Sequence, residues 1–280
     1  MKRGIILKNT KSFSLHFVML AVLFVLGESI INLPLKNANK LTFLGFIISL
    51  LLSLLVFYAV LRVDLLKYPV LFVALYTAGN TFITFLNFIS KNLLTKTPNF
   101  FILIIFLIPL LYFCFKKQNE ILNFSLISGL LCTALIIFFF FATFKDFNFE
   151  NIYIYSFPNI KNLFSQIVMY IKSVTLPIVV LALYAKQIGA SKKSAFCGVL
   201  VGNLFLLITI FNSILLFGTT LSAKLLYPYA SAISTVTFGN LFSRLDGFSY
   251  FIYFVAAVIK IAVCVKVIKN LLNSFKVKFS

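Results

Sequence analysis

The chain has 280 residues, of which 61% are hydrophobic and only 11% are charged, whereas a soluble domain has roughly 25% charged residues. So few charges cannot cover a water-facing surface, and the composition therefore predicts an integral membrane protein with several crossings. The net charge of +19 is compatible with nucleic-acid binding, but Lys and Arg are also enriched in the loops of membrane proteins. We therefore expect no nucleic-acid partner.

The residues that usually carry catalysis or bind metals are scarce. The chain has one His, His16, and few carboxylates, and its four Cys are scattered singly without the spacing of a metal site or a disulfide framework. We interpret these Cys as small hydrophobic residues. We expect no enzymatic activity, no metal and no cofactor.

Eight segments are apolar enough to cross a membrane, which requires about 20 mostly apolar residues. The first follows a basic stretch and resembles a signal peptide, but it lacks a small-residue cleavage site and continues as an apolar run, so we expect a retained helix. We therefore expect one all-α transmembrane domain over residues 1–280, with spans near residues 14–34, 41–61, 68–90, 98–115, 121–144, 163–185, 194–217 and 247–267.

The distribution of basic residues predicts the orientation. With the N-terminus in the cytoplasm, fifteen Lys and Arg residues fall on the inside and eight on the outside, which places both termini in the cytoplasm by the positive-inside rule. Two long loops, residues 145–162 and 218–246, then lie outside. In the second loop, residues 221–227 are interpreted as a short surface helix that Pro228 ends.

Charged residues inside spans need an explanation, since each costs about 2.5–3.5 kcal/mol near the bilayer centre. Glu28 in the first span stands between Gly27 and Ser29, and Pro34 follows. Gly and Pro are poor helix residues, so we predict an interrupted helix whose freed backbone groups can hold a ligand or ion. The alternative is a hydrated Glu28 near the outer interface.

Polar residues in the third span recur every three or four residues and share one helical face. They are Thr77, Asn80, Thr84 and Asn87. Such a face forms hydrogen bonds between helices or lines a polar cavity, and we include Asn80 and Thr84 in the candidate ligand site.

Two lysines lie within later spans. Lys172 in the sixth span precedes Ser173, Thr175 and Pro177, which again predicts an interrupted helix. Lys172 either snorkels outward or pairs with Glu28 so that each charge compensates the other.

Lys260 lies past the middle of the eighth span. It either snorkels to the cytoplasmic face or places its ammonium where a transporter core would hold a cation. The full candidate site is Gly27, Glu28, Ser29, Asn80, Thr84, Lys172, Ser173, Thr175 and Lys260.

One polar segment carries a resemblance to a known family. Tyr227-Pro228 is followed by Gly239-x-x-Phe242-x-Arg244-Leu245-Asp246, and this pair of motifs resembles the signature region of the spore germination permeases. These are the B-type subunits of nutrient germinant receptors in endospore-forming bacteria. The segment "SLHFVMLAVLFVLGESIINLP" is similar to the family's first helix.

The resemblance implies the fold of amino acid–polyamine–organocation transporters, with two inverted five-helix repeats and a site between spans one, three, six and eight. The family usually has ten helices, so the resemblance implies that the last two are lacking: this is a shortened member, the gene is truncated, or another subunit fills the gap. Residues 218–246 would form an extracellular cap over the site, where Arg244 and Asp246 bind neighbouring loops or each other, or Asp246 starts a helix.

The function implied is that of a germinant-sensing subunit in the inner membrane of the spore. It would bind a small nutrient, an amino acid in the first instance, and trigger ion release. Its partners would be an A-type membrane subunit and a C-type lipoprotein. The alternatives are an amino-acid permease of the same superfamily and a scaffold subunit that binds no ligand.

Overall fold

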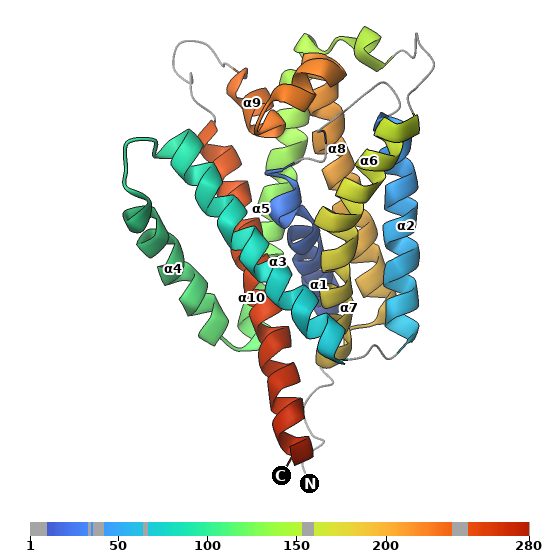
Figure 1. The fold of residues 1–280 in the computed structure, drawn as a ribbon, viewed down its shortest axis with the longest axis vertical. Helices are drawn as coiled ribbons and strands as arrows, with labels where there is room; N and C mark the ends of the chain where they lie inside the picture. Colours follow the sequence, from blue (N-terminus) through green and yellow to red (C-terminus); the bar gives the residue numbers. More distant parts are fainter. Residues whose placement is uncertain are drawn as a thin grey trace.

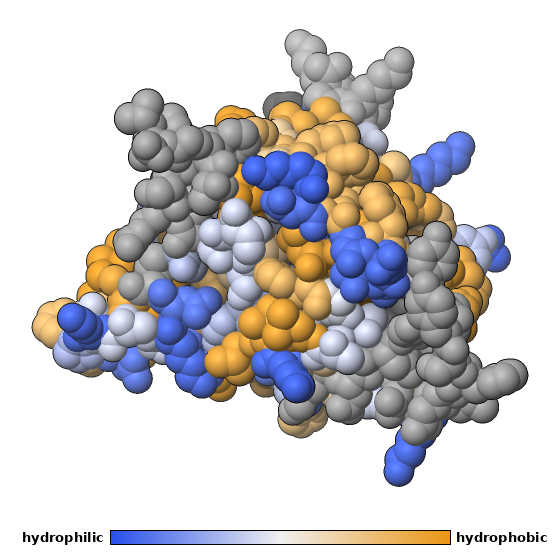
Figure 2. Space-filling view, turned by 90° about the horizontal axis from the view of Figure 1, so that it is seen from above, coloured by the Kyte–Doolittle hydropathy of each residue, from blue (hydrophilic) through white to orange (hydrophobic). Residues whose placement is uncertain are grey.

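We analysed a computed structural model of the chain, which describes residues 10–32, 35, 42–63, 67–152, 160–236 and 246–279. Every regular element in these ranges is helical. The longer helices stand side by side in a bundle, and the last described helix, α10, ends at the lower end of it (Figure 1). Seen from the opposite end, polar residues gather in patches between apolar ones (Figure 2).

The helices follow the apolar segments of the sequence. The α-helices are α1 (Thr10–Leu26), α2 (Thr42–Arg62), α3 (Lys67–Phe88), α4 (Asn99–Phe115), α5 (Gln118–Thr143), α6 (Ile160–Tyr170), α7 (Leu176–Ile188), α8 (Lys192–Lys224), α9 (Pro228–Ser234) and α10 (Asp246–Phe279). Short 3₁₀ turns follow α1 (Gly27–Ser29) and α5 (Phe144–Asp146 and Phe149–Ile152), and π-helical turns follow α3 (Ile89–Leu93) and α6 (Ile171–Thr175).

Six helical segments within the described residues are long and apolar enough to cross a membrane. They are Leu44–Arg62, Tyr68–Asn92, Gln118–Asp146, Leu163–Ile188, Lys192–Lys224 and Gly247–Ser274, and two shorter apolar helices are Ser14–Ser29 and Asn99–Phe115. The prediction of an all-α membrane protein with several crossings is confirmed. The number of crossings and the inverted repeat stay predictions.

Helix α1 forms the centre of the bundle. Its residues from Leu20 to Leu26 are all buried. Three glycines on neighbouring helices let it pack closely: a Cβ at Gly129 would stand 2.9 Å from Met19, one at Gly198 2.7 Å from Ala21, and one at Gly202 2.9 Å from Val25. Small residues at such contacts are how membrane helices approach each other. The end of α1 is therefore fixed inside the bundle.

Helices α3 and α10 pack along each other in opposite directions. Phe88, at the end of α3, contacts Tyr253 in the first part of α10, and Thr81 and Lys260 both approach the same carboxylate further along. Thr81 and Phe88 are seven residues apart on α3, and Tyr253 and Lys260 are seven residues apart on α10. Seven residues are about two helical turns. This pairing brings the polar face of α3 to the middle of α10. Helix α4 lies at the edge of the bundle (Figure 1).

The loop prediction after the seventh span needs two corrections. Helix α8 continues to Lys224 through a break at Gly218, which has φ 71°, and Pro228 begins α9 instead of only ending a surface helix. Pro suits the first turn of a helix because its missing N–H has no intrahelical partner there. The break is capped by the loop before α6: the backbone N–H of Asn148 and the side chain of Asn151 donate to Leu215 O at 3.1 and 3.0 Å.

The resemblance motif is only partly described. Tyr227 and Pro228 are buried at the start of α9, and Asp246 begins α10, while Gly239, Arg244 and Leu245 lie outside the described residues. Tyr229, Ala232 and Ile233 of α9 are also fully buried. Helix α9 is thus packed into the bundle more deeply than a water-facing loop.

Candidate functional site

Helix α1 ends in a break at Gly27. Its α-helical hydrogen bonding gives way to a 3₁₀ turn over Gly27–Ser29, and Gly27 has φ +21°, which L-residues with a side chain rarely adopt. The chain then turns, with the N–H of Asn32 donating to Glu28 O at 3.0 Å. The predicted interruption of the first span is therefore present, and it lies inside the protein, where Glu28 is 2% exposed. The alternative of a hydrated Glu28 is wrong.

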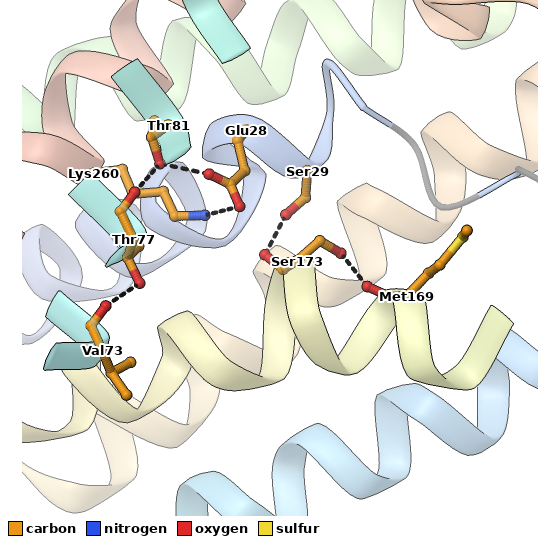
Figure 3. A network of polar contacts seen from close by, with 8 residues as sticks. All are labelled: Glu28, Ser29, Val73, Thr77, Thr81, Met169, Ser173 and Lys260. Carbon is orange, nitrogen blue, oxygen red and sulfur yellow. Dashed lines mark hydrogen bonds and ion pairs between the residues drawn. The ribbon is translucent and has the colours of Figure 1, made fainter. Parts of the chain in front are cut away.

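Glu28 reaches across to α3 (Figure 3). The hydroxyl of Thr81 donates to Glu28 Oε2 at 2.7 Å, and it also lies 2.8 Å from Thr77 O. Its single proton serves one of these acceptors at a time, and the ionised carboxylate is the stronger one. The hydroxyl of Thr77 donates in turn to Val73 O at 2.7 Å.

Lys260 supplies the opposite charge from α10. Its Nζ lies 3.9 Å from Glu28 Oε1 and 5.6 Å from the centre of the Phe24 ring, and the residue is fully buried. This Nζ has no hydrogen-bond partner among the described residues, although an ammonium carries three donors. The prediction that Lys260 snorkels to the cytoplasmic face is wrong, because the buried carboxylate attracts it instead.

Gly27 makes room for Lys260. A Cβ at Gly27 would overlap with Cδ of Lys260 and would stand 3.3 Å from both Cε and Nζ. The lysine stem therefore crosses the helix break at the one position where no side chain obstructs it. The glycine has two roles here: its backbone conformation ends α1, and its missing side chain lets the ammonium reach Glu28.

Ser29 ties the break to the sixth span. Its hydroxyl donates to Ser173 O at 3.0 Å. In a regular helix that carbonyl would accept from the N–H four residues later, but residue 177 is Pro and has no N–H. The predicted interruption of this span takes the form of a π-helical turn over Ile171–Thr175, a feature that often marks functional sites. It leaves the helix winding continuous, so the prediction of an unwound segment here is wrong.

The other predicted site residues are placed unevenly. Ser173 donates to Met169 O at 3.0 Å, and Thr175 is buried with its hydroxyl unpaired among the described residues. Lys172 has an exposed side chain, so the hypothesis of a Glu28–Lys172 pair is wrong. Thr84 is buried, whereas Asn80 is only partly buried.

Thr81 is the contact that the sequence analysis missed. The buried polar face of α3 contains Thr77, Thr81 and Thr84, and Asn87 is exposed. The buried face shares Thr77 and Thr84 with the predicted stripe, and Thr81 takes the place of Asn80. The spacing of four and three residues from Thr77 through Thr81 to Thr84, continuing to the buried Phe88, was the signal that could have found it.

The arrangement leaves two opposite charges without full hydrogen bonding. The Glu28 carboxylate and the Lys260 ammonium are both buried, and they are 3.9 Å apart, which is beyond hydrogen-bond distance. Broken helices at such positions are used by transporters to bind solutes with backbone groups. A molecule with one group of each charge would satisfy both side chains.

Comparison with known proteins decides the family. The model of the Spore_permease family, described as "Spore germination protein", matches residues 65–279, which is well over half of the chain. The chain belongs to this family. No curated protein and no solved structure matches it. This spore germination protein is thus a permease-like integral membrane subunit with a role in germination.

The family match includes three of the four elements that build the site. Thr81 on α3, Ser173 before α7 and Lys260 on α10 all lie within residues 65–279, and so does the Tyr227-Pro228 motif. Gly27 and Glu28 precede the matched range. The cation of the pair therefore lies in the matched region, and the carboxylate lies outside it.

Proposed function

We propose that this chain is the germinant-sensing subunit of a spore nutrient receptor. The family membership supports the role in germination, and the buried Glu28–Lys260 pair at the break of α1 supports ligand binding. The single observation that carries the proposal is the Lys260 ammonium, which is fully buried and has no hydrogen-bond partner among the described residues. A buried charge is costly unless it is both paired and hydrogen-bonded, and Lys260 has the ion pair with Glu28 but no hydrogen bond among the described residues.

The ligand that fits this site best is a small zwitterion, an amino acid in the first instance. Its carboxylate would accept hydrogen bonds from Lys260, and its ammonium would donate to Glu28. Inserting it would replace one loose ion pair by two charge-assisted hydrogen-bonded pairs, which are about twice as strong as neutral hydrogen bonds. The ligand would thereby satisfy the Lys260 donors, which have no partner among the described residues.

Binding would trigger germination by shifting a conformational equilibrium. A ligand favours the open receptor only if it binds that state better than the closed one. The Glu28–Lys260 contact joins α1 to α10, and the Ser29–Ser173 hydrogen bond joins α1 to the sixth span. A ligand that separates the charge pair would loosen α1 from α10, and ion release would follow in the assembled receptor.

The partners in this proposal are an A-type membrane subunit and a C-type lipoprotein, in the inner membrane of the spore with both termini of the chain in the cytoplasm. The proposal is tested in spores that carry Lys260→Met or Glu28→Gln. We expect the half-maximal nutrient concentration for germination to rise about tenfold or more, the equivalent of roughly 1.4 kcal/mol. Lys172→Met, which neutralises an exposed lysine, is the matched control and should respond like the parent.

Two other functions would give different results. An amino-acid permease would take up radiolabelled substrate in proteoliposomes as a purified protein alone. A scaffold subunit would respond to neither Lys260→Met nor Glu28→Gln when the variants are present at normal levels. Either result would replace the sensing function.

A further inference from the structure

A second group of buried polar atoms lies between α9 and α10. Tyr229 on α9 and Tyr253 on α10 are both fully buried. Their hydroxyl oxygens have no hydrogen-bond partner among the described residues. The two helices that carry them are in contact.

Aromatic packing fixes these side chains in place. Phe88 stands edge-on to Tyr253, with ring centres 4.8 Å apart, and edge-on to Tyr227, also at 4.8 Å. Edge-to-face contacts of this kind stabilise one ring orientation. The Phe88 ring on α3 therefore holds Tyr253 from one side. The same Phe88 ring contacts Tyr227 and so holds the start of α9. The hydroxyls cannot turn to water, because both rings are buried.

A buried hydroxyl without a partner costs free energy comparable to a lost hydrogen bond. Phe has the same shape without this cost, and the chain contains 36 Phe and 12 Tyr, so Phe is the common choice in its apolar core. Two buried phenols on contacting helices, both without a partner among the described residues, therefore indicate a bound water or small polar molecule as the partner. Buried waters and small polar molecules satisfy such groups with two or more hydrogen bonds.

The position of the pair relates it to the charged site. Tyr253 precedes Lys260 by seven residues, which is two turns along the same face of α10. On α3, the buried Thr84 lies between Thr81, which contacts Glu28, and Phe88, which contacts Tyr253. Tyr253 thus lies two turns from Lys260, next to the Phe88 ring that also contacts Tyr227 at the start of α9.

We propose that Tyr229 and Tyr253 form a second binding site, in which one small molecule with hydrogen-bond donor and acceptor groups bridges the two hydroxyls. The molecule is either an ordered water or the polar end of a solute. Its role as a station on the route to Glu28 and Lys260 rests on the proposed function, whereas the site itself does not.

The test is the sign of a thermal shift in purified protein. In the absence of nutrient, Tyr229→Phe and Tyr253→Phe should each lower the Tm by roughly 2–4 °C. The double variant should lower it no further than one single variant, because both hydroxyls bind the same molecule. Tyr170→Phe is the positive control, since the Tyr170 hydroxyl donates to Asn203 Oδ1 at 2.6 Å and its removal also costs a hydrogen bond.

An unchanged Tm of the single variants would overturn the proposal, and so would a higher one, because the hydroxyls would then have been unsatisfied and bound nothing. Fully additive losses in the double variant would also overturn it, because the two hydroxyls would then have separate partners. The same measurements in a Glu28→Gln/Lys260→Met background separate this site from the charged one, because the tyrosine effect should persist there even if no nutrient binds.

Repeating the melts with each common amino acid identifies the bound molecule. A solute in the site raises the Tm of the parent and not that of the Phe variants. If instead the difference between parent and Phe variants is the same with and without every amino acid, the bridging molecule is water.

Discussion

The side chain of Lys260 passes directly over Gly27, where helix α1 breaks, and its Nζ ends 3.9 Å from Glu28 Oε1. The break and the charge pair are therefore one structural unit. A side chain at residue 27 would move the lysine, and moving the lysine would leave Glu28 buried without its counter-ion. Each contact of this unit can be removed by a separate substitution.

Gly27→Ala should destabilise the protein and weaken the nutrient response together. The added methyl group overlaps with the Lys260 stem, and overpacking of a core costs about 1–3 kcal/mol. The measurement is the thermal melt of the purified variant, followed by germination of spores that carry it. Gly79→Ala is the matched control, since a Cβ there meets nothing within 4 Å and Ala is the better helix former by about 1 kcal/mol. Equal melts for the two variants would contradict the close contact.

Lys260→Met and Glu28→Gln should each be more destabilising than the two changes combined. Each single change leaves a partner without its counterpart, and breaking a buried pair costs about 3–5 kcal/mol. The double variant removes both charges and keeps their volume. Thermal melts of the four proteins give the coupling energy, and simple additivity would mean that the two side chains do not pair.

Thr81→Val should destabilise the protein by about 1.5–3 kcal/mol, the range for a hydrogen bond to a charged group. Thr81→Ser keeps the hydroxyl and should restore most of this loss. Thr133→Val is a suitable control, because the Thr133 hydroxyl donates only within its own helix, to Leu130 O at 3.0 Å. If the Thr81 and Thr133 variants melt alike, the bond to Glu28 contributes nothing.

Pro177→Ala should make Ser29 dispensable. The new N–H at residue 177 can donate to Ser173 O, which then no longer needs the Ser29 hydroxyl. Ser29→Ala should cost about 0.5–1.5 kcal/mol in the parent and close to nothing in the Pro177→Ala background. The same loss in both backgrounds would contradict the idea that Pro177 leaves the Ser173 carbonyl without its helical partner.

The helices and the break of α1 were predictable, because they depend on local properties. Apolar runs define the membrane helices, and a Gly followed by a buried charge marks a point where a helix does not continue. Pro177 likewise indicated a disturbed helix. Its exact form, a π-helical turn instead of an unwound segment, depends on what packs around it, and the sequence does not contain that information in any local pattern.

The partner of Glu28 was not predictable. Lys260 and Lys172 both lie in apolar spans, and the sequence offers no means of telling which one reaches a carboxylate on α1. The choice depends on the antiparallel contact between α3 and α10, and on the absence of a side chain at Gly27. Lys172 turns outward on its π-helical turn. Tyr229 and Tyr253 escaped notice for the same reason, since only the folded bundle brings them together.

The central claim is that the Glu28–Lys260 pair binds the nutrient, and ligand-induced stabilisation of the purified protein tests it most directly. The Tm is measured with and without each common amino acid, for the parent, the Lys172→Met control and the Glu28→Gln/Lys260→Met double variant. A ligand present at a hundred times its Kd stabilises by about 2.7 kcal/mol. We predict that at least one amino acid raises the Tm of the parent and the control and leaves that of the folded double variant unchanged. A double variant that is stabilised as much as the parent would contradict the account.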